Sequence, residues 1–147
     1  MGGEDETSES TQLKARLPRD LLASYIVSKK LGNGSCGTVY LGYKKLSSSR
    51  RAEESKGAIK VIAKGPSGTQ YTSACAEADI LKNLKHPSII KIEGIFANDK
   101  FIALVLEYAK GGELFQYVEN DWKTKNFNER IAKLQFYQVS ATWPASS

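Results

Sequence analysis

Cysteine and histidine are scarce in this chain of 147 residues, which holds two cysteines and one histidine. Cys36 and Cys75 stand in unrelated local sequences, without the paired spacing that marks a disulfide scaffold or a zinc site. His86 has no second histidine with which to bind a metal. The sequence therefore predicts reduced cysteines and no structural metal.

Long apolar runs are also missing, because the longest lies around Ile102–Leu106 and is far shorter than the roughly 20 residues that span a bilayer. The N-terminus is acidic, whereas a secretory signal is basic and then apolar. Gly2 follows the first methionine, but Glu6 stands where a myristoylation motif has Ser or Thr. We therefore expect a cytoplasmic or nuclear protein without a membrane anchor.

Basic residues are absent from the first 12 positions, which hold four acidic residues, whereas the rest of the chain holds 21 basic and 12 acidic residues. Residues 1–20 have little to bury and are expected to form a disordered acidic arm, with order beginning near Leu21. The lysines elsewhere are scattered and not interleaved with aromatic residues along one stripe, which disfavours nucleic-acid binding. We expect a solvated surface that attracts polyanions such as nucleotide phosphates.

A glycine-rich segment, Gly32–Gly37, has the pattern G-x-G-x-x-G between two predicted strands, Tyr25–Leu31 and Thr38–Tyr43. Two unrelated phosphate-binding architectures use this pattern, so alone it is a weak signal. The dinucleotide-binding version needs a helix directly after the glycines, whereas strand-forming residues follow here. A Walker A loop needs Lys where Thr38 stands. The pattern favours a β-hairpin whose backbone N–H groups face phosphate oxygens.

Lys60 lies in a third predicted strand, Lys56–Ala63, between two β-branched apolar residues. A lysine on a buried apolar strand has a desolvation cost that an anionic partner must offset. The alternative is structural: Lys56 and Lys64 share its parity, so an alternating strand would expose all three to water. The strand alone leaves both interpretations open.

The next segment is a predicted helix, Ser73–Leu84, which carries Glu77 and ends before Pro87 because the residue preceding a proline avoids the α region. Two more apolar segments of strand length follow, separated by a predicted Asn98-Asp99 turn: Ile89–Ile95 and Phe101–Tyr108.

The order of these parts resembles the N-terminal lobe of eukaryotic protein kinases. The signature G-x-G-x-x-G-x-V matches at Gly32, Gly34, Gly37 and Val39. The signature V-A-I-K matches at Ala58, Ile59 and Lys60, with Gly57 in place of the first Val. The resemblance extends from about Arg19 to Gln138.

This resemblance implies ATP as the ligand, with Lys60 on the α- and β-phosphates and Glu77 holding Lys60 by an ion pair. The stretch after Leu106, the implied gatekeeper, looks like the hinge between lobes, and Glu107 and Ala109 would offer backbone groups to adenine. Glu113 would contact ribose or a basic substrate residue. The implied nucleotide-binding set is Leu31, Gly32, Asn33, Gly34, Ser35, Cys36, Gly37, Val39, Ala58, Lys60, Leu106, Glu107, Ala109 and Glu113. Core packing alone also explains Leu31, Val39 and Ala58, the implied roof over the adenine ring.

Within the kinases, the chain most resembles serine/threonine kinases of the calcium/calmodulin-dependent group, and there the checkpoint kinase 2 type. The matching stretches are Tyr25–Lys29, Gly34–Gly37, Ile80–Ile92, Gly111–Phe115 and Lys133–Gln138.

The expected fold is therefore α+β: a kinase N-terminal lobe with about five antiparallel strands and one regulatory helix over residues 21–110, then the start of a C-terminal lobe over 111–138. Asn128 is expected to cap a helix with an apolar stripe at Phe127, Ile131, Leu134 and Tyr137. Residues 139–147 have no kinase-like pattern and form a separate tail.

The 147 residues contain no His-Arg-Asp, Asp-Phe-Gly or Ala-Pro-Glu motif. Kinases need an Asp to orient the substrate hydroxyl, and an Asp and an Asn to hold Mg²⁺. We therefore expect the ATP-binding portion of a serine/threonine kinase that is inactive as written and lacks the family's Mg²⁺ ligands. The alternative is a non-catalytic binding module whose unpaired helix docks on a protein partner or competes with a full-length kinase.

Overall fold

The computed structural model describes residues 11–12, 15–35, 37–45, 56–124 and 128–140. The chain divides into two compact units, one of residues 1–83 and 91–108 and the other of residues 84–90 and 109–147. Among the described residues no helix is long and apolar enough to cross a membrane.

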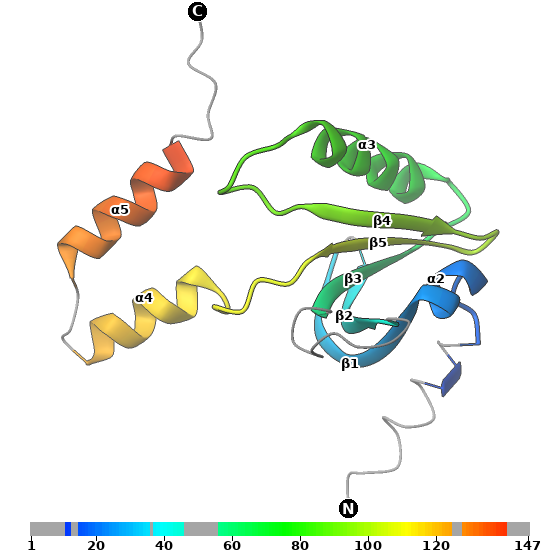
Figure 1. The fold of residues 1–147 in the computed structure, drawn as a ribbon, viewed down its shortest axis with the longest axis horizontal. Helices are drawn as coiled ribbons and strands as arrows, with labels where there is room; N and C mark the ends of the chain where they lie inside the picture. The colour runs from blue at the N-terminus through cyan, green and yellow to red at the C-terminus, as the bar shows by residue number, and fades with distance from the viewer. Residues whose placement is uncertain (1–10, 13–14, 36, 46–55, 125–127, 141–147) are drawn as a thin grey trace, which may run out of the picture. The chain divides into compact units, whose positions relative to one another are not determined.

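The first unit is built on a five-stranded antiparallel sheet in the order β1-β2-β3-β5-β4 (Figure 1). Its strands are β1 (Tyr25–Gly34), β2 (Gly37–Lys44), β3 (Lys56–Ala63), β4 (Ile92–Ala97) and β5 (Phe101–Glu107). This sheet, together with a few helices, confirms the predicted α+β class. The central strands β3 and β5 are buried on both faces, which explains why their sequences are nearly continuous apolar runs.

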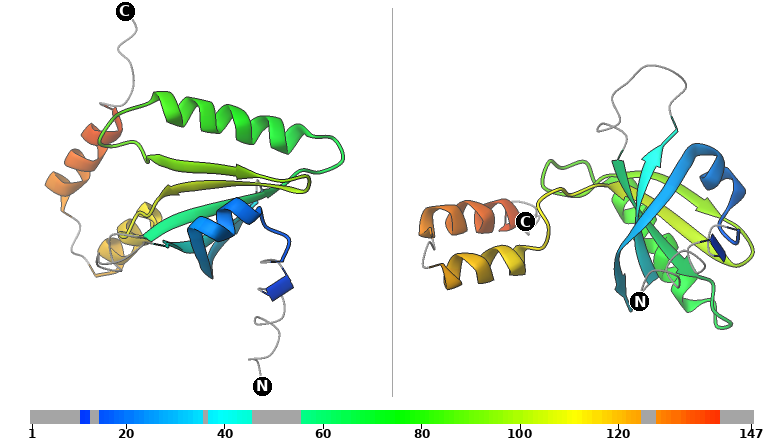
Figure 2. Two further views of the ribbon diagram at one scale, coloured as in Figure 1. Left: turned by 45° about the vertical axis from the view of Figure 1, so that its right-hand side comes forward. Right: turned by 90° about the horizontal axis from the view of Figure 1, so that it is seen from below.

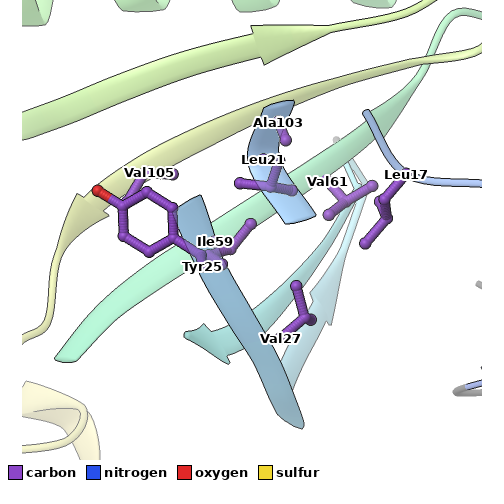
Figure 3. Packing of buried hydrophobic residues seen from close by; sticks show 8 residues of the cluster. All are labelled: Leu17, Leu21, Tyr25, Val27, Ile59, Val61, Ala103 and Val105. Atoms are coloured by element: carbon purple, nitrogen blue, oxygen red, sulfur yellow. The ribbon is translucent and has the colours of Figure 1, made fainter. Parts of the chain in front are cut away.

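One face of the sheet is covered by the N-terminal segment and α2 (Arg19–Ser24). Figure 3 shows Leu17 and Leu21 lying against alternate residues of β3 and β5. We call this cluster the α2-side core; its members are Leu17, Leu21, Tyr25, Val27, Ile59, Val61, Ala103 and Val105.

The opposite face is covered by α3 (Thr69–Asn83), as the two views of Figure 2 make visible. Ala74 and Ala78 of this helix are fully buried, and their small side chains let the helix lie close to the sheet. We call this cluster the α3-side core; its members are Ile62, Ala74, Ala78, Ile102 and Leu104. It places α3 on the same face as Lys60, because Lys60 and Ile62 are two residues apart on one strand.

Two predicted boundaries in the first unit were wrong. Order does not begin near Leu21, since Leu17 is only 3% exposed and α2 starts at Arg19. A six-residue helix is too short to show a helical period in the sequence, so it was missed. The helix α3 begins four residues before Ser73, directly after Gly68, whose φ of +67° is a conformation that glycine adopts without strain. Residues 1–10 lie outside the described part of the chain.

The second unit contains two helices, α4 (Leu114–Lys123) and α5 (Glu129–Ser140). Asn128 caps α5 as predicted, because its Oδ1 accepts hydrogen bonds from the N–H groups of Arg130 at 3.0 Å and Ile131 at 3.3 Å. Both helices expose large apolar side chains: Leu114, Phe115, Tyr117, Val118, Ile131, Leu134, Phe136 and Tyr137. Phe127, also predicted for this stripe, lies outside the described residues, as does the tail from residue 141.

We expect fast amide hydrogen exchange over residues 129–138 in a dilute monomer and slow exchange over β3 and β5. An isolated helix needs roughly 12–15 residues even to be marginally stable, and α5 has 12 with its large apolar side chains exposed. Exchange followed by mass spectrometry at two protein concentrations tests this. Slow exchange in α5 at the lower concentration would contradict the expectation, and protection that grows with concentration would indicate self-association through the exposed side chains.

Candidate nucleotide-binding site

The glycine-rich segment forms the turn of a β-hairpin between β1 and β2, as its sequence predicted. The pairs Gly32–Val39, Asn33–Thr38 and Gly34–Gly37 lie opposite one another in register. The Thr38 hydroxyl donates a hydrogen bond to Asn33 Oδ1 at 2.6 Å, which links the two arms next to the turn. Ser35 is exposed at the turn, and Cys36 lies outside the described residues.

The glycines of this hairpin are not equivalent. Gly37 has a φ of +135°, and a Cβ there would collide with the backbone carbonyl of Val61 in the neighbouring strand β3. Gly32, by contrast, has no atom within 4 Å of the place where its Cβ would stand. Gly37 is therefore required by the close approach of the hairpin to β3, whereas Gly32 leaves open space beside the backbone.

Lys60 and Glu77 form an ion pair between β3 and α3, which is the contact that the resemblance implied. Lys60 Nζ lies 2.9 Å from Glu77 Oε1 and 2.7 Å from Oε2. The side chains are 20% and 38% exposed, so Lys60 does not extend freely into water as the structural alternative required.

Stability does not account for this pair. Partly exposed ion pairs contribute at most about 1 kcal/mol, and apolar residues in such positions often stabilise a protein as well or better. Lys60 nevertheless stands in a row of apolar neighbours, with Val39 of β2 and Leu104 of β5 directly opposite it on either side. The pair fixes an ammonium group among these apolar neighbours.

Two of the residues expected to cover an adenine ring, Val39 and Ala58, share this face. Ala58 lies two residues from Lys60 and is directly opposite Leu41 and Leu106. Leu31, at 39% exposure, lies on β1 just before the hairpin turn. Sequence reasoning omitted Leu41 and Leu104, although their spacing of two from Val39 and Leu106 would have placed them on the same face.

Gly57, which departs from the kinase signature, is buried beside Val105 and Leu106. A Cβ at this position would lie 3.3 Å from Val105 Cγ1 and 3.4 Å from the Leu106 carbonyl oxygen. The valine expected at this point would therefore crowd β5, and glycine avoids the contact.

Glu107, at the end of β5, is anchored by both its backbone and its side chain to Lys91. Its N–H donates to the Lys91 carbonyl at 2.8 Å, and its Oε2 accepts from the Lys91 N–H at 3.2 Å. The expected contact of Glu107 with adenine is thus left to its carbonyl group. Ala109 and Glu113 belong to the second unit, where both are exposed and the Glu113 carbonyl accepts the Tyr117 N–H at 3.2 Å.

Metal-binding groups do not gather in the described part of the chain: no three His, Cys, Asp or Glu side chains there could hold one ion. Mg²⁺, which accompanies ATP in kinases, therefore has no ligand set among these residues. Cys75 is a free thiol on α3, and its hydrogen bond with Tyr71 raises the pKa of the tyrosine. The ammonium of Lys64 lies 4.3 Å from the centre of the Tyr71 ring.

Comparison with known families places this geometry in a defined class. Residues 25–143 match the protein kinase domain, and this range contains the whole sheet and helices α3, α4 and α5. The chain belongs to the protein kinase domain family. The match extends a few residues past Gln138, into the segment for which the sequence analysis found no kinase-like pattern.

Individual relatives are serine/threonine kinases or carry kinase in their names. The chain is 35% identical over 111 residues to "Fatty acyl-CoA synthetase and RNA processing-associated kinase 1" of Saccharomyces cerevisiae, covering 71% of this chain. It is 34% identical over 115 residues to "Probable serine/threonine-protein kinase 2" of Plasmodium falciparum, covering 78%. It is 30% identical over 135 residues to "Serine/threonine-protein kinase chk-2" of Caenorhabditis elegans, covering 83%. The chain spans only 13%, 20% and 26% of these three relatives' lengths.

Replacing Gly37 with Ala should lower the free energy of unfolding by about 1 to 3 kcal/mol, because the new Cβ meets the Val61 carbonyl in a backbone conformation that strains L-residues. The matched change Gly32→Ala should alter it by no more than about 0.5 kcal/mol, since nothing lies within reach of its Cβ. Urea unfolding followed by circular dichroism measures both. Equal losses in the two variants would contradict the distinction drawn between these glycines.

Proposed function

We propose that this chain is the ATP-binding portion of a serine/threonine protein kinase. The observation that carries the proposal is the bidentate contact of Lys60 with Glu77, which holds an ammonium group on an apolar sheet face. Nucleotides combine an apolar aromatic base with a polyanion, and this face offers both an apolar surface and a fixed cation.

The phosphates would lie between the glycine-rich hairpin and Lys60. Val39, on the hairpin's second strand, stands directly opposite Lys60, so the hairpin turn is only two residues along β2 from the row that holds the ammonium group. The open space beside Gly32 allows a ligand to approach the backbone closely. The base would rest on Ala58 and Leu106, with Leu31 and Val39 beside it, and the Glu107 carbonyl would face its edge.

The finer family assignment rests on resemblance. We propose a member of the calcium/calmodulin-dependent group, of the checkpoint kinase 2 type, in the cytoplasm or nucleus. In the complete family fold ATP binds together with Mg²⁺ and is the phosphoryl donor. No step through Mg²⁺ is assigned to this chain, whose described residues lack the ligands for it.

ATP should bind the purified chain weakly, with a dissociation constant above about 1 mM, because the sequence has no Asp-Phe-Gly or His-Arg-Asp motif and the described residues hold no metal-ligand set. Amide chemical shifts of a ¹⁵N-labelled sample, followed during an ATP titration, provide the measurement. The shifts should concentrate at Gly32, Gly34, Val39 and Lys60. Lys60→Met should abolish them.

The matched control is Lys30→Met, which removes an exposed lysine of β1 from the opposite face of the sheet. This variant should respond to ATP as the unaltered chain does. An equal loss of the ATP-induced shifts in both variants would mean that ATP binding depends on the overall positive charge and not on the Lys60 site. A micromolar affinity abolished only by Lys60→Met would overturn the expectation of weak binding and show that this chain alone builds a competent site.

The chain by itself should not phosphorylate a peptide, because its sequence contains neither a His-Arg-Asp nor an Asp-Phe-Gly motif. Transfer of radiolabel from γ-labelled ATP to a serine-containing peptide tests this, with the Lys60→Met variant as the background sample. Incorporation above that background would show that the missing motifs are dispensable.

A second candidate function is that of a non-catalytic binding module. The observation in its favour is the row of exposed apolar side chains on α5, of which Phe136 and Tyr137 are 75% and 71% exposed. A protein partner, such as a full-length kinase with which this chain competes, would remove these side chains from water. Protection of α5 from hydrogen exchange that appears only when such a kinase is added would favour this function.

A further inference from the structure

The side of α3 that packs against the sheet carries two alanines and two larger side chains. Tyr71, Ala74, Cys75 and Ala78 follow one another at intervals of three or four residues, which places them on one side of the helix, and all four belong to the α3-side core or pack against it. Alanine brings the helix close to the strands but offers no long side chain that could interlock with them. Tyr71 has the largest side chain of the four, and it contributes most to fixing how the helix lies on the sheet.

Tyr71 is held from two sides. Its hydroxyl forms a hydrogen bond with the side chain of Cys75, one turn further along the helix. The ammonium group of Lys64 lies 4.3 Å from the centre of the Tyr71 ring. Lys64 is itself fixed to the sheet, because its backbone N–H donates a hydrogen bond to the Lys100 carbonyl at 2.8 Å. The ring therefore joins the first turn of α3 to the residue that follows β3.

The backbone between Lys64 and α3 restrains the helix only weakly. It contains Gly65 and Gly68, and a Cβ at either position would meet no atom within 4 Å. A hydrogen bond from the Gly68 N–H to the Gly65 carbonyl, at 3.0 Å, closes the turn between them. Glycine is the residue with the widest choice of backbone conformations. The contact of Lys64 with Tyr71 thus adds a side-chain restraint where the backbone is most permissive.

Glu77 depends on this placement of α3, because it lies between one and two turns beyond Tyr71 on the same helix. Its carboxylate oxygens are 2.9 Å and 2.7 Å from Lys60 Nζ. A separation of about 3.6 Å is no longer a hydrogen bond, so an outward shift of α3 by about 1 Å would break both contacts in this rotamer. The ion pair therefore needs a helix whose position is closely fixed.

We propose that Tyr71 is a positioning residue, whose ring holds α3 so that Glu77 contacts Lys60. The ring carries this role and not the hydroxyl, because the ring makes the contact with Lys64. The part that the ion pair plays in binding phosphates rests on the proposed function, whereas the placement of Glu77 by Tyr71 does not.

The test measures the acetylation rate of Lys60 in the full chain, without any nucleotide. An amine reacts with acetic anhydride only after it has lost its proton, and a carboxylate in contact with it favours the protonated form. Mass spectrometry of peptides gives the rate at Lys60 relative to the exposed Lys30, and Glu77→Gln gives the ratio without the ion pair. Tyr71→Leu should raise the ratio by about threefold or more, toward the Glu77→Gln value. Tyr71→Phe, which keeps the ring, should leave it unchanged.

The matched control is Ile95→Val, which also removes packing from the α3-side core but does so on β4. It should leave the Lys60 ratio unchanged even where urea unfolding shows a loss of stability. An equal rise in Ile95→Val and Tyr71→Leu would overturn the proposal, because any loosening of this core would then release Lys60. An unchanged ratio in Tyr71→Leu would also overturn it, and an equal rise in Tyr71→Phe would contradict the role given to the ring.

A second variant serves if Tyr71→Leu does not fold. Lys64→Gln removes the cation and leaves every side chain of the α3-side core in place. It should raise the Lys60 ratio by about twofold or more, because the Tyr71 ring loses the charge that holds it. An unchanged ratio in this variant would refute the role assigned to the contact between Lys64 and Tyr71.

Discussion

The first unit depends on a sheet that is buried on both of its faces. Ile59, Val61, Ala103 and Val105 contact the N-terminal segment and α2, while Ile62, Ile102 and Leu104 contact α3. Two layers of helix thus hold the central strands β3 and β5 between them. A polar side chain on these strands needs a hydrogen-bonding or charged partner, or access to water at the edge of the sheet, because burying it alone costs free energy. Lys60 is such a side chain.

Lys60 meets that condition through α3. Glu77 is three residues from Ala74 and one from Ala78, the two alanines that let α3 lie close to the sheet. Close packing of the helix therefore brings the carboxylate within hydrogen-bond distance of the ammonium group. The α3-side core and the ion pair are parts of one arrangement, and moving α3 outward would open both together.

Most of the sheet could be predicted from the sequence, because strand residues, glycine turns and the order of motifs all point to the same topology. The Lys60–Glu77 contact, by contrast, followed only from resemblance. Lys56, Lys60 and Lys64 alternate with other residues along the chain, so a strand with all three lysines exposed to water was an equally good interpretation. The helix α2 was not predicted, because six residues are too few to show a helical repeat of apolar residues. Its two leucines pack against strands that are distant in the sequence.

The two hydrogen bonds between Glu107 and Lys91 join the end of β5 to the start of β4. Lys91 is the last residue before β4, and its carbonyl and N–H are both tied to the end of β5. The segment that follows α3 is therefore held against the end of β5 at Lys91. The same two hydrogen bonds fix the register of β4 against β5, the strand that leads toward the expected hinge. The Glu107 carboxylate, which has no evident chemical role, therefore has a structural one.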